Sequence, residues 1–193
     1  QNIVKKVKTL QPIPMVIHKI LALADDPDQG SGELVRLVEH DAAITANLLR
    51  TCNSAQMGLR VKVDSLHQAV TMLGMRSVVE MILAQNLGVN LQKAQKGYRL
   101  AKGDLWKQSV AAAMIARSLA ERHELLSLPT IYTAALLKDI GKVVLEQYVE
   151  AGAKDIQMLV ENGEYSFEEA EKSVIGIDHA QLGGIVAQKW NFP

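Results

Sequence analysis

Apolar residues recur at helical spacing along almost the whole chain, and no stretch of useful length alternates between polar and apolar residues. Ile44, Leu48 and Cys52 follow one another at intervals of four residues, and Leu66 and Val70 repeat that interval. This spacing gathers apolar side chains on one face of a helix, whereas a half-buried strand requires strict alternation. We therefore expect an all-α fold without a sheet.

Turn residues divide the chain into short helices, and a polar segment at 93–103 separates two groups of them. At 193 residues the chain forms a single domain 1–193, with an amino-terminal helical lobe of about 1–96 and a second helical lobe of about 97–193. We expect the segment 93–103 to join the lobes. A long helix over 105–122 contains an almost purely apolar stretch, 111–116, which favours a central, buried position. Other helices are expected at roughly 14–24, from 31 through 34–38, and at 41–52, 65–73, 76–91, 128–138, 143–148, 153–161, 167–175 and 178–190.

Composition argues against several classes of function. Lys plus Arg equals Asp plus Glu at 21 each, so the electropositive footprint of a nucleic-acid-binding protein is missing. No apolar run approaches the ~18 residues of a membrane-spanning helix, and the polar, Lys-rich start does not resemble a signal peptide. The single cysteine, Cys52, cannot form an internal disulfide, which fits the reducing cytosol and a cytoplasmic protein.

Six phrases of the sequence, in this order, resemble the HDOD domain family, the HD-related output domains of bacterial signalling proteins. They are LQPIP at 10–14, LLRTCNSA at 48–55, SLHQAVTMLG at 65–74, LWKQS at 105–109, LLKDIGK at 136–142, and GIDHAQLG at 176–183 followed by WNFP at 190–193. The resemblance implies a fully helical, two-lobed HD-like domain. It covers the chain from about residue 10 to residue 193.

The same resemblance implies a degenerate metal site. In HD hydrolases, imidazoles and carboxylates hold metal ions that activate water against a phosphoester. At the matching positions this chain has Gln108 and Lys138 in place of histidines, and it keeps Asp139, His179 and the neighbouring Asp178. An ammonium has no lone pair for a metal and repels it, and a catalytic site needs about three protein ligands. We therefore expect no bound metal, no cofactor and no catalytic residue.

The residues leave other interpretations open at these positions. Lys138 and Asp139 could form an ordinary solvated helix end, or the Lys138 ammonium could replace the lost ion by pairing with Asp139 and Asp178. His179 fits a first-turn packing residue as well as a vestigial ligand. Asn53 and Ser54 fit a helix cap and turn as well as a ligand or partner contact. A cluster of acidic residues is interpreted as a solvated first turn of a helix: Glu164, Glu168, Glu169 and Glu171.

We accordingly expect a non-catalytic, regulatory binding module of bacterial signal transduction. A cleft between lobes or the former metal pocket would engage a small ligand or a signalling protein of a sensory, phosphorelay or cyclic-dinucleotide pathway, and binding would shift the lobes. A homo-oligomer is compatible with this reading. The alternative is a metal-dependent phosphohydrolase or phosphodiesterase whose site is completed by further residues, and a nucleic-acid-binding regulator is a third, disfavoured by the balanced charge.

Overall fold

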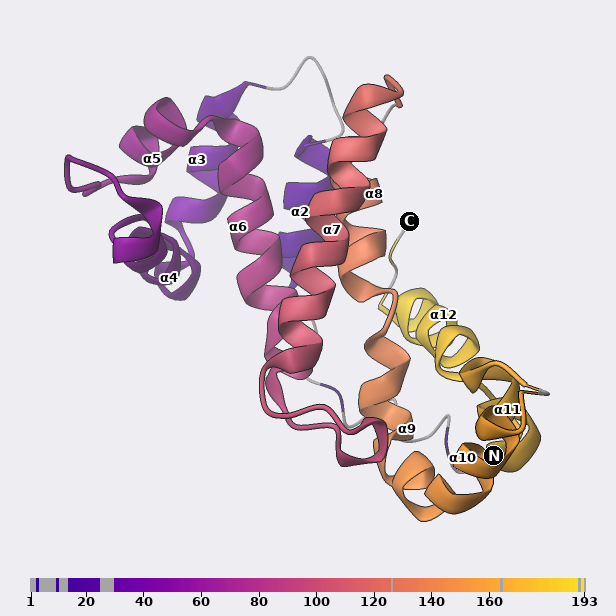
Figure 1. The fold of residues 1–193 in the computed structure, drawn as a ribbon. Helices are drawn as coiled ribbons and strands as arrows, with labels where there is room; N and C mark the ends of the chain where they lie inside the picture. Colours follow the sequence, from indigo (N-terminus) through magenta and orange to yellow (C-terminus); the bar gives the residue numbers. More distant parts are fainter. Residues whose placement is uncertain are drawn as a thin grey trace. The chain divides into compact units, whose positions relative to one another are not determined.

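A computed structural model describes residues 3, 10, 14–24, 30–125, 127–163, 165–190 and 192. Within these ranges the regular structure is helical, and the only ladder-type pairing is an isolated antiparallel bridge between Gln95 and Leu100 (Figure 1). The expected all-α fold is confirmed. None of the described helices is long and apolar enough to cross a membrane.

The chain separates into two compact units, each made of segments distant in sequence. The amino-terminal unit comprises Ile13–Leu87 and Ala116–Thr133, and the carboxyl-terminal unit comprises Gly88–Ile115 and Ala134–Pro193. Two helices contribute to both units, namely α7 (Asp104–Arg122) and α8 (Leu128–Leu137). The two lobes expected from the sequence, about 1–96 and 97–193, are each one continuous segment of the chain. That division into lobes stays a prediction.

The amino-terminal unit is built by short amphipathic helices, two of which begin with a side-chain cap. Asp41 accepts hydrogen bonds from the backbone of Ala43 and Ile44, and Ser65 accepts one from Gln68, which satisfies N–H groups that have no partner within the helix. The helices are α2 (Met15–Ala24), α3 (Ser31–Glu39), α4 (Ala42–Cys52), α5 (Leu66–Leu73) and α6 (Met75–Leu87), with a 3-10 turn η2 (Ala55–Met57). Cys52 is buried in its core, as its spacing predicts.

The carboxyl-terminal unit contains the helices that carry the chemistry discussed below. They are α9 (Ile140–Ala151), α10 (Ala153–Glu161), α11 (Phe167–Ile175) and α12 (His179–Lys189), together with the 3-10 turns η3 (Gly88–Gln92) and η4 (Lys96–Tyr98). A helix expected over 76–91 changes to 3-10 geometry at Gly88. A side chain there would lie 2.3 Å from the ring of Trp106, so only glycine admits that ring.

Two expectations about buried and joining segments were wrong. The segment 93–103 is packed within the carboxyl-terminal unit: Gln95 is 1% exposed, and a Cβ at Gly97 would lie 2.6 Å from backbone atoms of α9. The apolar stretch of α7 is not buried on all sides, because Met114 and Ile115 are 52% and 61% exposed. Periodicity cannot reveal either fact, since a polar turn can be packed through its backbone and an apolar helix can leave one face open.

Candidate functional site

The site forms where the first turns of α9 and α12 pack against each other. Gly141 makes this approach possible, because a Cβ added there would lie 1.9 Å from the carbonyl oxygen of His179 and 2.9 Å from the backbone nitrogen of Gly183. Asp139 directly precedes α9, and His179 is the first residue of α12. The helix contact therefore brings Oδ1 of Asp139 to 3.6 Å from Nε2 of His179, although the residues are far apart in sequence.

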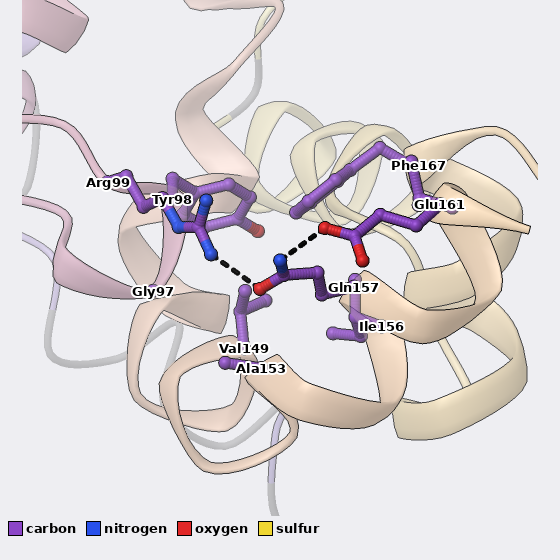
Figure 2. A pocket seen from close by; sticks show the side chains of 10 residues that line it. Gly97, Tyr98, Arg99, Val149, Ala153, Ile156, Gln157, Glu161 and Phe167 are labelled. Atoms are coloured by element: carbon purple, nitrogen blue, oxygen red, sulfur yellow. Dashed lines mark hydrogen bonds between the residues drawn. The ribbon is translucent and has the colours of Figure 1, made fainter.

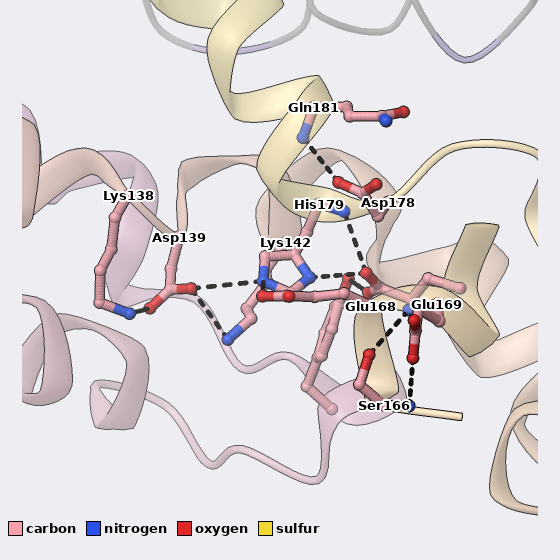
Figure 3. A network of polar contacts seen from close by, with 11 residues as sticks. Lys138, Asp139, Lys142, Ser166, Glu168, Glu169, Asp178, His179 and Gln181 are labelled. Atoms are coloured by element: carbon pink, nitrogen blue, oxygen red, sulfur yellow. Dashed lines mark hydrogen bonds and ion pairs between the residues drawn. The ribbon is translucent and has the colours of Figure 1, made fainter. Parts of the chain in front are cut away.

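The Asp139 carboxylate is buried and has an ammonium partner at each oxygen (Figure 3). The Lys142 ammonium lies 3.0 Å from Oδ1, and the Lys138 ammonium pairs with Oδ2. Burial raises the pKa of the Asp139 carboxyl, but hydrogen bonds and charge from Lys138 and Lys142 outweigh it and hold that pKa below its ordinary value of 3.8. Asp139 is therefore ionised and its charge is balanced by lysines.

A buried acid fixes the His179 ring. Glu171 is fully buried, and its Oε2 lies 2.6 Å from Nδ1 of His179 while accepting a hydrogen bond of 3.0 Å from the backbone N–H of His179. Its other oxygen accepts a 2.5 Å hydrogen bond from the hydroxyl of Tyr98. The Nε2 atom of His179 faces Asp139 and, at 3.5 Å, Glu168. Glu171 thus orients the imidazole and selects which nitrogen faces the pocket.

This network corrects the interpretation of the acidic cluster as a solvated turn. Glu171 has no exposed surface, although Glu168 is exposed and Glu169 closes a capping box with Ser166. Glu164 lies outside the described residues. No local pattern distinguishes Glu171 from its exposed acidic neighbours, because it is buried through its contacts with Tyr98 and His179.

Tyr98 connects the turn η4 to the same network. Its ring packs edge-on against the His179 ring, with centroids 6.1 Å apart, and the Lys142 ammonium lies 5.6 Å from the Tyr98 centroid. Burial raises the pKa of the Tyr98 hydroxyl, as do its hydrogen bond to Glu171 and the negative charge there. The residue is therefore a firm hydrogen-bond donor. No periodic pattern points to Tyr98, whereas Lys142 was visible three residues after Asp139.

Four of the predicted positions line one pocket of about 490 Å³: Gln108, Lys138, Asp139 and His179. Tyr98, Lys142, Phe167 and Glu168 also line this pocket, which we call the polar pocket. Asp178 lies beside it but is not among the residues that line it. Its carboxylate accepts a 2.7 Å hydrogen bond from the backbone of Gln181 and caps α12 (Figure 3). The ammonium of Lys138 has Asp139 as its partner, and the described contacts include none with Asp178.

Asn53 and Ser54 belong to the amino-terminal unit. The Asn53 amide donates to the carbonyls of Leu49 and Val63, at 2.8 and 2.7 Å, and its oxygen accepts from the backbone N–H of Val63 at 2.8 Å. It thereby ends α4 and holds the loop that follows. Ser54 precedes η2 without a side-chain capping bond. The Asn53 amide therefore has a structural use, and a ligand or partner contact at these residues stays a prediction.

The residues of the polar pocket do not fit a catalytic metal ion. Each oxygen of Asp139 already has a cationic partner, and the side-chain amide oxygen of Gln108 is a weak ligand for a transition metal. Nδ1 of His179 is bonded to Glu171, so the imidazole could present only Nε2. Among the residues that the structure describes, no group of three or more His, Cys, Asp or Glu side chains is arranged to hold an ion. An ammonium at 3.0 Å from the retained carboxylate repels a divalent cation.

The chain resembles several bacterial proteins along its entire length. A solved HDOD domain protein of unknown function from Geobacter sulfurreducens is 25% identical, with a TM-score of 0.75 over 100% of this chain and 65% of that one. A presumed phosphohydrolase from Shewanella amazonensis SB2B is 27% identical, with a TM-score of 0.71 over 99% of this chain and 67% of that one. A presumed signal transduction protein from Marinobacter aquaeolei VT8 is 26% identical, with a TM-score of 0.74 over 96% and 42% of the two chains.

An uncharacterised protein of Treponema pallidum (strain Nichols) is 23% identical over 199 residues. The chain spans only 37% of that protein's length. The model of the HDOD domain matches residues 10–193, which include both units, the polar pocket and every phrase on which the resemblance was based. The chain therefore belongs to the HDOD domain family, which is related to the HD phosphohydrolases.

Proposed function

We propose that this HDOD domain is a non-catalytic regulatory module of bacterial signal transduction, and that it acts by binding. The observation that carries the proposal is the pairing of both Asp139 oxygens with the ammonium groups of Lys138 and Lys142. A buried carboxylate that has lost its metal needs another counter-charge, and these lysines supply it. The scaffold of the HD site is thereby kept intact without the ion that would activate water.

The polar pocket is the surface we propose for ligand or partner binding. Lys138 is 55% exposed and Gln108 is also exposed, so both present N–H groups to solvent, while the floor made by Asp139 and His179 is buried. A partner that contacts these groups in one arrangement of the domain and not in another would shift the population toward the first. We expect partners among sensory, phosphorelay or cyclic-dinucleotide signalling proteins, or a small ligand, in the cytoplasm.

The competing function is metal-dependent hydrolysis of a phosphoester, which the name of the Shewanella relative suggests for that protein. In this chain hydrolysis would require a divalent ion to displace two ammonium groups from one carboxylate. Desolvating the ion against that repulsion is unfavourable unless additional ligands compensate. The pairing of Asp139 therefore favours binding over hydrolysis.

The test compares metal uptake by the wild type with that of a variant carrying Gln108→His and Lys138→His. After incubation with Mn²⁺, Fe²⁺, Ni²⁺ or Zn²⁺ and desalting, elemental mass spectrometry should find below about 0.1 equivalent in the wild type and clearly more in the variant. Near-stoichiometric metal in the wild type, with hydrolysis of bis(p-nitrophenyl) phosphate that Asp139→Ala abolishes, would refute the proposal and establish the phosphohydrolase. The double variant controls for loss of the pocket itself.

A further inference from the structure

A second pocket, which shares Tyr98 and Phe167 with the polar pocket, lies between the turn η4 and the helices α9, α10 and α11 (Figure 2). Its volume is about 250 Å³, and we call it the apolar pocket. Val149 and Ile156, each 1% exposed, line it together with Ala153, Val160 and Phe167. A cavity of about 150 Å³ with such walls is enough to hold a benzene ring. The space therefore suits a ligand with a single ring or a short aliphatic body.

One edge of the apolar pocket carries a chain of polar side chains. An N–H of the Arg99 guanidinium donates to the side-chain oxygen of Gln157 at 2.5 Å, and the amide nitrogen of Gln157 donates in turn to Glu161 (Figure 2). Within the described part of the chain, no carboxylate lies at ion-pair distance from Arg99. The guanidinium has five N–H groups, so it can bond to a further acceptor at the pocket edge.

The backbone holds Arg99 at this edge in a conformation that its side chain does not favour. Arg99 has φ 56° and ψ 31°, in the left-handed region where glycine or asparagine is more easily accommodated. Two backbone hydrogen bonds between Gln95 and Leu100 close the turn, and Gly97 packs directly on α9. This closed turn therefore fixes the point from which the Arg99 side chain extends along the pocket edge.

We propose that the apolar pocket binds a small aromatic or aliphatic carboxylate. The apolar body lies among Val149, Ile156 and Phe167, and the carboxylate accepts hydrogen bonds from Arg99, which exchanges its bond to Gln157 for the ligand. A purely apolar ligand would desolvate the guanidinium without replacing its partners, whereas a carboxylate pairs with it bidentately. This site does not depend on the function proposed for the polar pocket, because it involves neither Asp139 nor a metal.

The test titrates benzoate, and separately the neutral isostere benzamide, into methyl-labelled protein followed by NMR. We expect benzoate to shift the methyl resonances of Val149 and Ile156 at millimolar concentrations, and benzamide to bind about tenfold more weakly or worse. Arg99→Asn, which suits the left-handed conformation, should weaken benzoate binding by a similar factor. The control Arg122→Gln removes a cation on α7, outside the pocket, and should leave the affinity unchanged.

Filling the pocket provides an independent check. Ala153→Phe should abolish the shifts, and Val160→Trp serves the same purpose if the first variant does not fold. The proposal is overturned if the Val149 and Ile156 methyl groups do not respond to benzoate below about 10 mM. It is also overturned if benzoate binds equally to Arg99→Asn and the wild type, or if a folded pocket-filling variant retains binding. None of these results bears on metal uptake at Asp139, so the two proposals fail separately.

Discussion

Replacing Gly141 with alanine should damage the site through one methyl group. The added Cβ would meet the carbonyl oxygen of His179 at 1.9 Å and the backbone nitrogen of Gly183 at 2.9 Å, whereas ordinary contact begins at 3.4 Å. Both obstacles are backbone atoms of α12, so no side chain can rotate away. The two helices would have to separate by more than an ångström, about 1.5 Å if the shift lies along the closest contact.

The cost of that separation can be bounded. Overpacking a close-packed interior costs about 1–3 kcal/mol and occasionally more, and alanine returns about 1 kcal/mol through its helix propensity. Because the obstruction is rigid on both sides, we expect the upper end of the first range. Gly141→Ala should therefore lower the free energy of unfolding by about 2 kcal/mol, and by more if the strain exceeds the usual overpacking range. Separation would also lengthen the 3.6 Å approach of Asp139 to His179.

Urea denaturation followed by circular dichroism measures the change, and Gly184→Ala is the matched control. Gly184 lies in α12 beside Gly183, but a Cβ there meets no atom within 4 Å. Alanine at that position should stabilise the protein by about 0.5–1 kcal/mol through helix propensity alone. If Gly141→Ala proved as harmless as Gly184→Ala, the backbones of α9 and α12 could not be in contact, and the geometry derived for the site would be wrong.

Three further predictions concern charges in the site. In chemical denaturation, Lys142→Met should lower the free energy of unfolding by about 2 kcal/mol and Lys138→Met by about 1 kcal/mol. The difference is expected because the Lys142 side chain is 18% exposed and that of Lys138 is 55% exposed. Equal losses would contradict the burial of the pair between Lys142 and Asp139. Glu171→Gln should cost about 2 kcal/mol and the exposed control Glu168→Gln less than about 0.5 kcal/mol by the same assay, and a neutral Glu171→Gln would refute the buried network. The pKa of Asp139 is lower in the folded state than its ordinary value of 3.8, so its ionised carboxylate stabilises the fold fully above that pH. This stabilisation is lost as the pH falls through the lowered pKa. Between about pH 5 and pH 2, the free energy of unfolding should therefore fall more steeply with decreasing pH for the wild type than for Asp139→Asn. Equal slopes would contradict the lowered pKa of Asp139.

The sequence was sufficient to identify the helical fold and the family, because both depend on local signals. The spacing of Ile44, Leu48 and Cys52 predicts an amphipathic helix wherever it occurs, and α4 buries all three residues. The family phrases also marked Gln108, Lys138, Asp139 and His179, which do line one pocket. Asp178 was grouped with them because it is adjacent to His179, yet its carboxylate serves as a helix cap.

The residues that complete the site could not be found in this way. Glu171 follows several acidic residues that are exposed, and only the packing of α11 against α12 turns its side chain inward to His179. Tyr98 lies in a polar segment without periodicity and reaches Glu171 because Gly97 lets the turn pack against the backbone of α9. Burial of a charged group depends on partners distant in sequence, and such partners leave no local pattern.

The sequence by itself therefore determined that the chain is helical and that it belongs to the HDOD family, and it predicts that Lys138 stands where HD hydrolases have a metal-binding histidine, since each depends on residue type and spacing. Only the tertiary structure decided that Lys138 and Lys142 neutralise opposite oxygens of Asp139, and that Arg99 lies at the edge of a separate apolar pocket. The physical reason is that electrostatic pairing and cavity shape depend on distances between helices. Close helix contacts, such as the one at Gly141, set those distances.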